Sequence, residues 1–214
     1  SLRFLKAAGL PVVDARLVGS VDAAEAAAAA LGFPVALKVA ADDILHKSDV
    51  GGVALGLKSL PALREAYAAM AAGVAAKTGR PVETFLVAPM IADGVETVLG
   101  VHRDPVFGPV VMFGLGGIFV EALGDVVFRA APIGRDEAHR MIRGIRSFRI
   151  LQGVRGRPPA DIDALAAALA RLSVIAAAHA DTIESIDVNP FLVRANGQGA
   201  VALDALVIPR KASE

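Results

Sequence analysis

The feature that most constrains the fold is a block of four apolar segments, each typical of a β-strand, set between alanine-rich runs. The segments are ETFLVAPMI, ETVLGVHRD, GPVVMFG and DVVFRAAPI, and turn residues such as Ala92-Asp93-Gly94 and Asp104-Pro105 separate them. Runs such as DIDALAAALARL instead carry leucine at helical spacing, which indicates helices. The two patterns in one chain predict an α+β protein.

The predicted elements group into two α+β lobes, residues 1–85 and 86–214. Ser20 and Ser59 are expected to open the two helices of the first lobe. At the C-terminal end, two strands at 182–193 and 200–208 flank Ala195-Asn196-Gly197, and Asn-Gly favours the positive φ angles of a tight hairpin turn. Because Ser1 falls inside a helix-like pattern, we expect a fragment of a longer chain or a β subunit.

The composition argues against several classes of protein. Lys and Arg together number 22, as do Asp and Glu, so the formal net charge is zero and a broad attraction to nucleic acid is not expected. The chain has no cysteine, which excludes disulfides, thiolate catalysis and cysteine metal sites and fits a cytoplasmic location. No apolar run reaches the roughly 18 to 20 residues that a membrane span needs. We therefore expect a cytoplasmic protein with neither nucleic acid nor membrane as a partner.

The loop DILHKSDVGG contains His46 and follows a strand that carries Lys38. Lys38 lies in the apolar strand PVALKVA, where a buried ammonium needs a negative partner such as a nucleotide phosphate; the alternative is a side chain that reaches solvent at the strand end. His46 is a competent nucleophile that Asp49 could orient, although a loop histidine is more often a solvated surface residue. The following Gly51-Gly52 pair allows close approach of the backbone to an anion.

Three oxygen-bearing side chains are expected to converge near the C-terminal hairpin. A turn centred near residues 196 and 197 brings Asn189 roughly opposite Asp204, and strand alternation puts Asp187 on the same face as Asn189. Mg²⁺ prefers oxygen ligands, usually one or two carboxylates together with substrate phosphates. These residues are either a magnesium site or a satisfied polar group at the end of a sheet, and acids inside apolar strands are costly without a partner.

Other polar or glycine-rich positions give weaker signals. Glu96 opens an apolar strand where a ribose contact would be suitable, and Arg129 could contact phosphate or a partner, although a surface arginine is usually solvated. Gly116 and Gly117, in FGLGGIFVE, lack the spacing of a phosphate-binding P-loop or of a dinucleotide fold. A hairpin with a bulge is the simpler interpretation of these glycines.

Taken together, the motifs resemble the ATP-grasp domain of the nucleoside-diphosphate-forming acyl-CoA synthetases, such as the ADP-forming acetate–CoA ligases. The resemblance rests on PVALKVAADDILHKSDVGGV, on VETVLGVHRDPVFGPVVMFGLGGIFVE, on VRGRPP, and on IDVNPFLV followed by LDA. A more distant resemblance is to the β subunit of succinyl-CoA synthetase. The resemblance to the acyl-CoA synthetases implies the ATP-grasp fold, with two α+β lobes and the nucleotide site between them.

The resemblance also implies cofactors, roles and partners. The cofactors would be ATP or ADP with Mg²⁺, and His46 would be a phosphohistidine that, with Asp49 beside it, carries a phosphoryl group between the nucleotide and a CoA-binding partner domain or α subunit. Acyl-CoA or acyl phosphate would be involved only indirectly, through that partner. The implied nucleotide contacts are Lys38, Val87, Ala88, Met90, Glu96, Gly116, Gly117 and Arg129, and the implied metal ligands are Asn189, Asp204 and Asp187.

The resemblance leaves three functions open. The first is the nucleotide-binding half of an acid–thiol ligase that forms a carbon–sulfur bond. The second is a regulatory or degenerate ATP-grasp region of a protein lysine acetyltransferase. The third is a non-enzymatic module that docks the CoA-binding half. Retention of His46, Asn189 and Asp204 favours the ligase.

Overall fold

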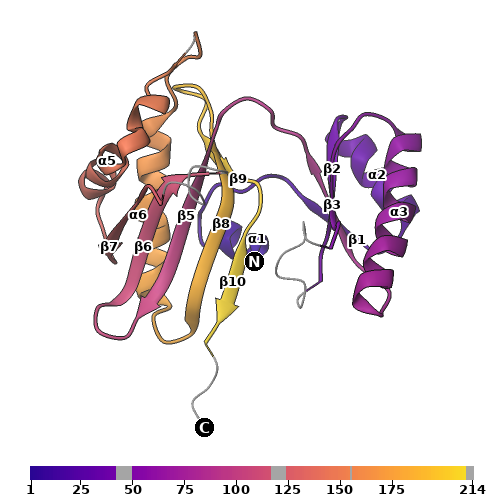
Figure 1. Ribbon diagram of the computed structural model, residues 1–214, viewed down its shortest axis with the longest axis horizontal. Helices are drawn as coiled ribbons and strands as arrows, with labels where there is room; N and C mark the ends of the chain where they lie inside the picture. The colour runs from indigo at the N-terminus through magenta and orange to yellow at the C-terminus, as the bar shows by residue number, and fades with distance from the viewer. Residues whose placement is uncertain (42–49, 117–123, 155, 211–214) are drawn as a thin grey trace. The chain divides into compact units, whose positions relative to one another are not determined.

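The computed structural model describes residues 1–41, 50–116, 124–154 and 156–210, which form two compact units (Figure 1). Unit 1 consists of Ser1–Val12 and Asp93–Glu214, and unit 2 of Val13–Ala92. The first twelve residues thus group with the C-terminal unit, whereas the division drawn from the sequence placed them in the first lobe. Both units combine helices with antiparallel sheets, which confirms the predicted α+β class.

Unit 2 is a four-stranded antiparallel sheet in the order β1-β4-β2-β3, with two helices packed on one face. Its elements are β1 (Arg16–Val18), α2 (Val21–Leu31), β2 (Val35–Val39), β3 (Val53–Leu57), α3 (Leu60–Thr78) and β4 (Phe85–Pro89). Both helices begin at the predicted serine caps, because Ser20 Oγ accepts from Ala23 N at 3.2 Å and Ser59 Oγ from Ala62 N at 3.4 Å.

Unit 1 is built on a six-stranded antiparallel sheet in the order β10-β8-β5-β6-β7, with β9 also paired to β8. The strands are β5 (Val95–Asp104), β6 (Gly108–Leu115), β7 (Val126–Ala130), β8 (Ile183–Val193), β9 (Ala200–Ala202) and β10 (Leu206–Pro209). The helices are α1 (Leu2–Ala7), α5 (Arg135–Gly144), the 3₁₀ helix η1 (Arg146–Ile150) and α6 (Ile162–Ala178). The predicted four-strand block is therefore confirmed as β4 to β7.

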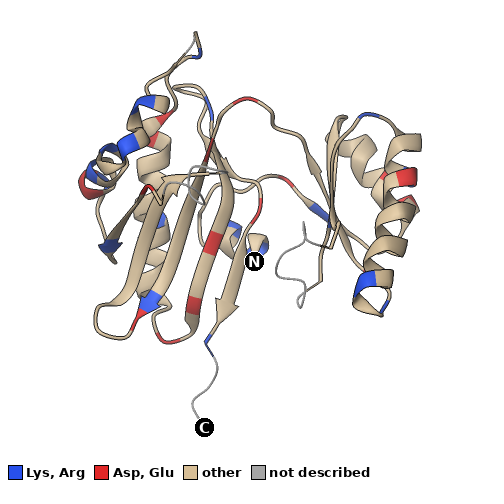
Figure 2. Cartoon of the chain, viewed as in Figure 1, with Lys and Arg blue, Asp and Glu red and all other residues tan. Residues whose placement is uncertain are grey.

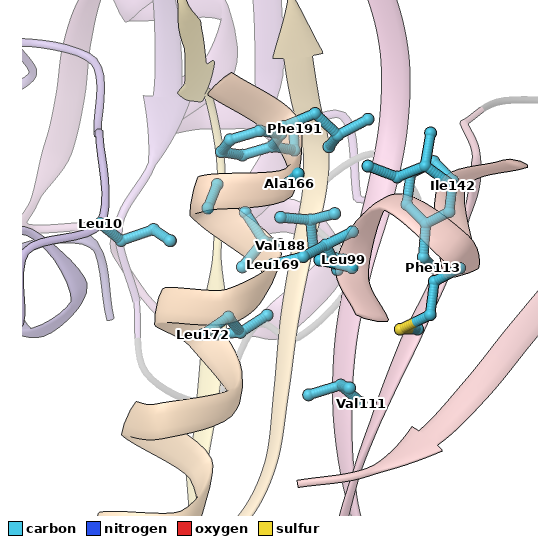
Figure 3. Close-up of a cluster of buried hydrophobic side chains, with 14 of the residues drawn as sticks. Leu10, Leu99, Val111, Phe113, Ile142, Ala166, Leu169, Leu172, Val188 and Phe191 are labelled. Atoms are coloured by element: carbon cyan, nitrogen blue, oxygen red, sulfur yellow. The ribbon is translucent and has the colours of Figure 1, made fainter. Parts of the chain in front are cut away.

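The core of unit 1 lies between α5, α6 and one face of this sheet (Figures 1 and 3). Leu99 and Phe113 from the strands meet Leu169 from α6 and Ile142 from α5, and all four side chains are fully buried. Among the described residues of unit 1, no helix covers the opposite face of the sheet (Figure 1). The exposed polar residues of β8 alternate with its buried ones and so belong to that face. In the described part of the chain, no helix is long and apolar enough to cross a membrane.

The C-terminal hairpin forms as the sequence predicts, but its second strand is divided. Gln198 N donates to Ala195 O at 2.8 Å, and Gly197 has a φ of 80°, so the Asn-Gly segment makes the expected turn. The single predicted strand at 200–208 is wrong, because residues 203–205 interrupt it between β9 and β10. Both pieces nevertheless pair with β8, at Phe191–Val193 and at Ile183–Asp187.

One buried carboxylate organises this hairpin. Asp161 is 7% exposed, and its Oδ1 accepts from Ala164 N at 3.0 Å as the N-cap of α6. Its Oδ2 accepts from Gly197 N at 3.0 Å and from Gly199 N at 2.9 Å. The same side chain therefore caps the helix that covers the core and closes the turn after β8.

We predict that Asp161→Ala destabilises the protein by about 2 to 4 kcal/mol, because it removes a helix cap and leaves backbone N–H groups without their acceptor. Asp161→Asn keeps one acceptor oxygen and is expected to lose less. Urea unfolding followed by circular dichroism measures both. A loss below about 0.5 kcal/mol for the alanine variant, the size of an ordinary surface substitution, would contradict this role.

Candidate functional site

Two polar side chains of β8 lie on the sheet face that α5 and α6 leave open. Along β8, Ile186 and Val188 are buried in the core of unit 1, and the residues that alternate with them, Asp187 and Asn189, are exposed. Figure 2 shows acidic positions on this strand in red. The alternation predicted from the sequence thus places Asp187 and Asn189 on one face, because successive strand residues point to opposite sides.

A β-bulge lies at Asn189 itself. The pairs Leu99↔Val188 and Thr97↔Phe191 leave one residue between them on β5 and two on β8, namely Asn189 and Pro190. The extra residue reverses the alternation, so that Phe191 joins Val188 in the same core cluster. A proline inside a central strand fits a bulge, since it has no N–H to donate to a neighbouring strand.

Asp204 lies beside this bulge, in the segment between β9 and β10. The register Phe191↔Ala202, followed by a hydrogen bond from Leu203 N to Pro190 O at 3.0 Å, brings the next residue opposite Asn189. Asp204 Oδ1 accepts from Ala205 N at 2.9 Å, which fixes the orientation of the carboxylate. The structure therefore brings the three predicted metal ligands together within unit 1.

The donor set suits a magnesium ion. Asp187, Asn189 and Asp204 offer two carboxylates and one amide oxygen, and Mg²⁺ is usually held by one or two carboxylates with waters and substrate phosphates. Among the described residues, no group of three or more His, Cys, Asp or Glu is placed to hold a metal ion. The site is thus compatible with a cation that arrives with a phosphate-bearing substrate and not with an all-protein cage.

Glu96 and Gly116 are brought into direct contact. Gly116 N donates to Glu96 O at 2.8 Å at the point where β6 ends beside β5. A Cβ at position 116 would lie 3.2 Å from the Glu96 backbone carbon, oxygen and Cβ. A side chain at 116 would thus require Glu96 to shift by a few tenths of an ångström, so the present position of Glu96 is matched to a glycine there.

Asp125 lies on the C-terminal side of the glycine-rich segment FGLGGIFVE and is hydrogen-bonded to the start of η1. Its carboxylate accepts from Arg146 N at 2.8 Å, from Ser147 N at 2.7 Å and from the Ser147 hydroxyl. Burial raises the pKa of Asp125, but the hydrogen bonds from Ser147 and Arg146 outweigh it and hold the pKa below its usual range. Both described ends of this segment are therefore tied to strand or helix backbone.

Lys38 occupies the face of the unit 2 sheet that the helices do not cover. Val35, Leu37 and Val39 belong to the helix-facing core, so alternation turns Lys38 to the other face, and it is 8% exposed. Its strand neighbours are Val53 on β3 and Leu86 on β4. The position agrees with the predicted buried stem of this lysine.

Three of the nucleotide contacts that the resemblance implies, Val87, Ala88 and Met90, are those expected at the adenine. They lie in or just after β4, a central strand. Val87 pairs with Arg16 on β1 and with Leu37 on β2, and its side chain is in the helix-facing core. Ala88 points to the opposite face, and Met90 N donates to Pro34 O at 3.0 Å. The adenine contact therefore stays a prediction, and Met90 N–H already has an acceptor within unit 2.

Arg129 is held by an acidic neighbour. It lies on edge strand β7, and its Nε donates to Glu137 Oε1 at 2.6 Å, while Arg140 Nε donates to Glu137 Oε2 at 2.6 Å. Hydrogen bonds from Arg129 and Arg140 hold the pKa of Glu137 below its usual range. A phosphate contact by Arg129 stays a prediction and would compete with this pair.

Three predicted site residues, His46, Asp49 and Gly117, lie outside the described residues. In the described part, sequence reasoning missed Thr97, whose fully buried hydroxyl donates to Phe191 O at 2.7 Å beside the bulge. The signals in the sequence were a threonine inside the apolar strand VETVLGV and a proline inside IDVNPFLV. Neither signal alone specifies that the two positions are neighbours.

Sequence comparisons find relatives over nearly the whole chain. The ATP-grasp domain family matches residues 1–208. The chain is 44% identical over 207 residues to subunit beta of acetate–CoA ligase [ADP-forming] II of Pyrococcus furiosus, covering 95% of this chain and 87% of that subunit. It is 43% identical over 201 residues to acetate–CoA ligase [ADP-forming] I of Archaeoglobus fulgidus, covering 94% of this chain but only 29% of that protein.

Solved structures agree with the sequence comparisons. The chain matches the dinucleotide-forming acetyl-coenzyme A synthetase 1 of Ca. Korarchaeum cryptofilum, in complex with coenzyme A, Ca-AMPCP and HgCl⁺, at a TM-score of 0.92 and 39% identity. The match covers 97% of this chain and 90% of that one. A second structure of that synthetase, with coenzyme A and Mg-AMPPCP, has its phosphohistidine segment pointing towards the nucleotide-binding site. It matches at a TM-score of 0.81 and 38% identity, over 97% of this chain and 89% of that one.

We predict that Gly116→Ala weakens ADP binding by about tenfold, because the added methyl group displaces Glu96 at a cost within the range seen for overpacking. Isothermal titration calorimetry gives the affinity. Gly73→Ala is the matched control, since nothing lies within 4 Å of a Cβ there. Equal losses in both variants, or none in Gly116→Ala, would contradict the proposed placement of Glu96.

Proposed function

The chain belongs to the ATP-grasp domain family, and from that premise we propose that it is the nucleotide-binding part of an ADP-forming acyl-CoA synthetase. The observation that carries the proposal is the cluster at the β8 bulge, formed by exposed Asp187 and Asn189 and half-buried Asp204. Oxygen ligands on an open sheet face are what a phosphate-bound magnesium ion requires. The relatives named above are acetate–CoA ligases, which favours a ligase over a regulatory or docking module.

Each candidate residue has a distinct role in this proposal. Asp187, Asn189 and Asp204 would hold Mg²⁺, which when bound neutralises charge on the phosphoryl oxygens. The Lys38 ammonium would contact phosphate as a point charge, and the Glu96 carboxylate would accept hydrogen bonds from ribose hydroxyls. The remaining predicted contacts, which complete the nucleotide site, are Val87, Ala88, Met90, Gly116, Gly117 and Arg129.

His46 would carry the phosphoryl group. A ring nitrogen of His46 would form a P–N bond as the bond from phosphorus to the donor atom on the partner breaks. In the next step that P–N bond breaks while an oxygen of the ADP terminal phosphate forms the new P–O bond of ATP. Asp49 would orient the imidazole. Such a transfer depends on positioning and charge neutralisation more than on covalent activation by the protein.

The proposal requires a partner, because acid and CoA must be bound elsewhere. The chain spans 29% of the length of the Archaeoglobus fulgidus ligase and 87% of a relative that is named a beta subunit. We therefore assign the CoA-binding step, and contact with acyl-CoA or acyl phosphate, to a separate domain or α subunit. A cytoplasmic location remains the expectation from the sequence.

Two variants separate nucleotide binding from phosphoryl transfer. We predict that Lys38→Met weakens Mg²⁺–ADP binding by about 10- to 100-fold, the loss expected for a hydrogen bond to a charged group. His46→Asn should bind Mg²⁺–ADP as the wild type does but acquire no acid-labile label from ³²P-phosphate, acyl-CoA and the CoA-binding half. Calorimetry and label counting give the two results.

Lys58→Met, at an exposed lysine of the same unit, is the control and should change neither result. Labelled His46→Asn protein would refute the carrier role. Wild-type protein that binds no Mg²⁺–ADP would refute the nucleotide-binding function as a whole.

A further inference from the structure

The hydroxyl of Thr97 is a polar group inside an otherwise apolar core. Thr97 is fully buried, and its alternation along β5 matches that of Leu99 and Val101, which face α5 and α6. A buried hydroxyl is costly unless it is hydrogen-bonded. Thr97 Oγ1 meets this requirement by donating to Phe191 O at 2.7 Å on the neighbouring strand.

This hydrogen bond joins Thr97 to Phe191, the residue that directly follows the bulge of β8. Phe191 is the first residue that returns to regular pairing, and Thr97 is its partner on β5. On the other side of β8, Leu203 N donates to Pro190 O at 3.0 Å. The two-residue bulge is therefore held from both neighbouring segments, by a side chain on one side and by backbone on the other.

The alternative register shows what this bond prevents. If the pairing Thr97↔Phe191 continued without the extra residue, Asn189 would stand opposite Leu99. Leu99 and Val101 are buried against the helices, so Asn189, and with it Asp187 opposite Val101, would then turn into the core and away from the open sheet face. A one-residue shift of register moves a side chain to the opposite face of a sheet.

We infer that Thr97 is a positioning residue for the cation site: its hydroxyl fixes the Asn189–Pro190 bulge and so keeps Asn189, together with Asp187, on the open sheet face beside Asp204. The inference rests on the proposed binding of a Mg²⁺–nucleotide. Thr97 itself faces the core and contacts neither metal nor nucleotide. Its effect is therefore on the metal-dependent part of nucleotide affinity.

The test compares two substitutions. Thr97→Val keeps the shape of the side chain but removes the hydroxyl, whereas Thr97→Ser keeps the hydroxyl. Thr97→Val should weaken Mg²⁺–ADP binding by about fivefold to tenfold, the loss of one ordinary hydrogen bond, and leave ADP binding without metal unchanged. Thr97→Ser keeps the hydroxyl and should restore wild-type affinity. Calorimetric titrations with and without Mg²⁺ give all of these affinities.

A second measurement needs no ligand. Hydrogen exchange of the Leu203 amide, read by NMR, should be about tenfold faster in Thr97→Val and near wild type in Thr97→Ser, as expected for a bulge that has lost one hydrogen bond. Thr78→Val is the matched control, because it removes a hydroxyl that donates to Val74 O at 2.8 Å in unit 2. It should change neither Leu203 exchange nor the effect of Mg²⁺.

The outcomes are separable. Faster Leu203 exchange together with a loss confined to the Mg²⁺-dependent affinity supports the inference. Unchanged exchange and affinity in Thr97→Val, or equal losses with and without Mg²⁺, overturn it. Failure of the wild type to bind Mg²⁺–ADP overturns the proposed function and the inferred link to the cation, while the exchange data still decide whether Thr97 holds the bulge.

Discussion

The candidate cation site depends on a mismatch of one residue between two neighbouring strands. Between the pairs Leu99↔Val188 and Thr97↔Phe191, β8 has two residues, Asn189 and Pro190, where β5 has one. The extra residue lets β8 bury Val188 and Phe191 on the same side of the sheet. Without the extra residue, the strand could not present Asn189 to the open face and Phe191 to the core. The missing N–H of proline makes position 190 suited to the interruption.

The same strand links the site to the stability of unit 1. Its core-facing residues pack against α5 and α6, while the turn that follows is closed by Asp161, the cap of α6. Residues 203–205, which include Asp204, lie beside the bulge and form no regular strand pairs. The geometry of the polar cluster is thus set by helix packing, by a cap and by the register of a central strand, and not by contacts among the polar groups alone.

Much of this arrangement could be predicted from local sequence because local rules govern it. The serine caps and the Asn-Gly turn act within a few residues, and the strict alternation up to Asn189 placed Asp187 and Asn189 on one face. The interruption between β9 and β10, the bulge and the bond from Thr97 to Phe191 depend on residues up to 94 positions apart. Their pairing is decided by core packing across the sheet, which no single segment encodes. The roles of His46, Asp49 and Gly117 rest on the resemblance alone.

The central claim is that a divalent cation bound with the nucleotide sits at the β8 bulge. Mn²⁺ in place of Mg²⁺ tests it directly, because the unpaired electrons of the ion broaden the NMR signals of nearby nuclei. With ADP present, we expect selective broadening of the Asn189 side-chain amide and of the backbone amides of Asp187 and Asp204, while the Phe107 amide, in the turn beyond the far end of β5 in the same unit, stays sharp. A sharp Asn189 amide beside strong broadening elsewhere in the chain would contradict the account.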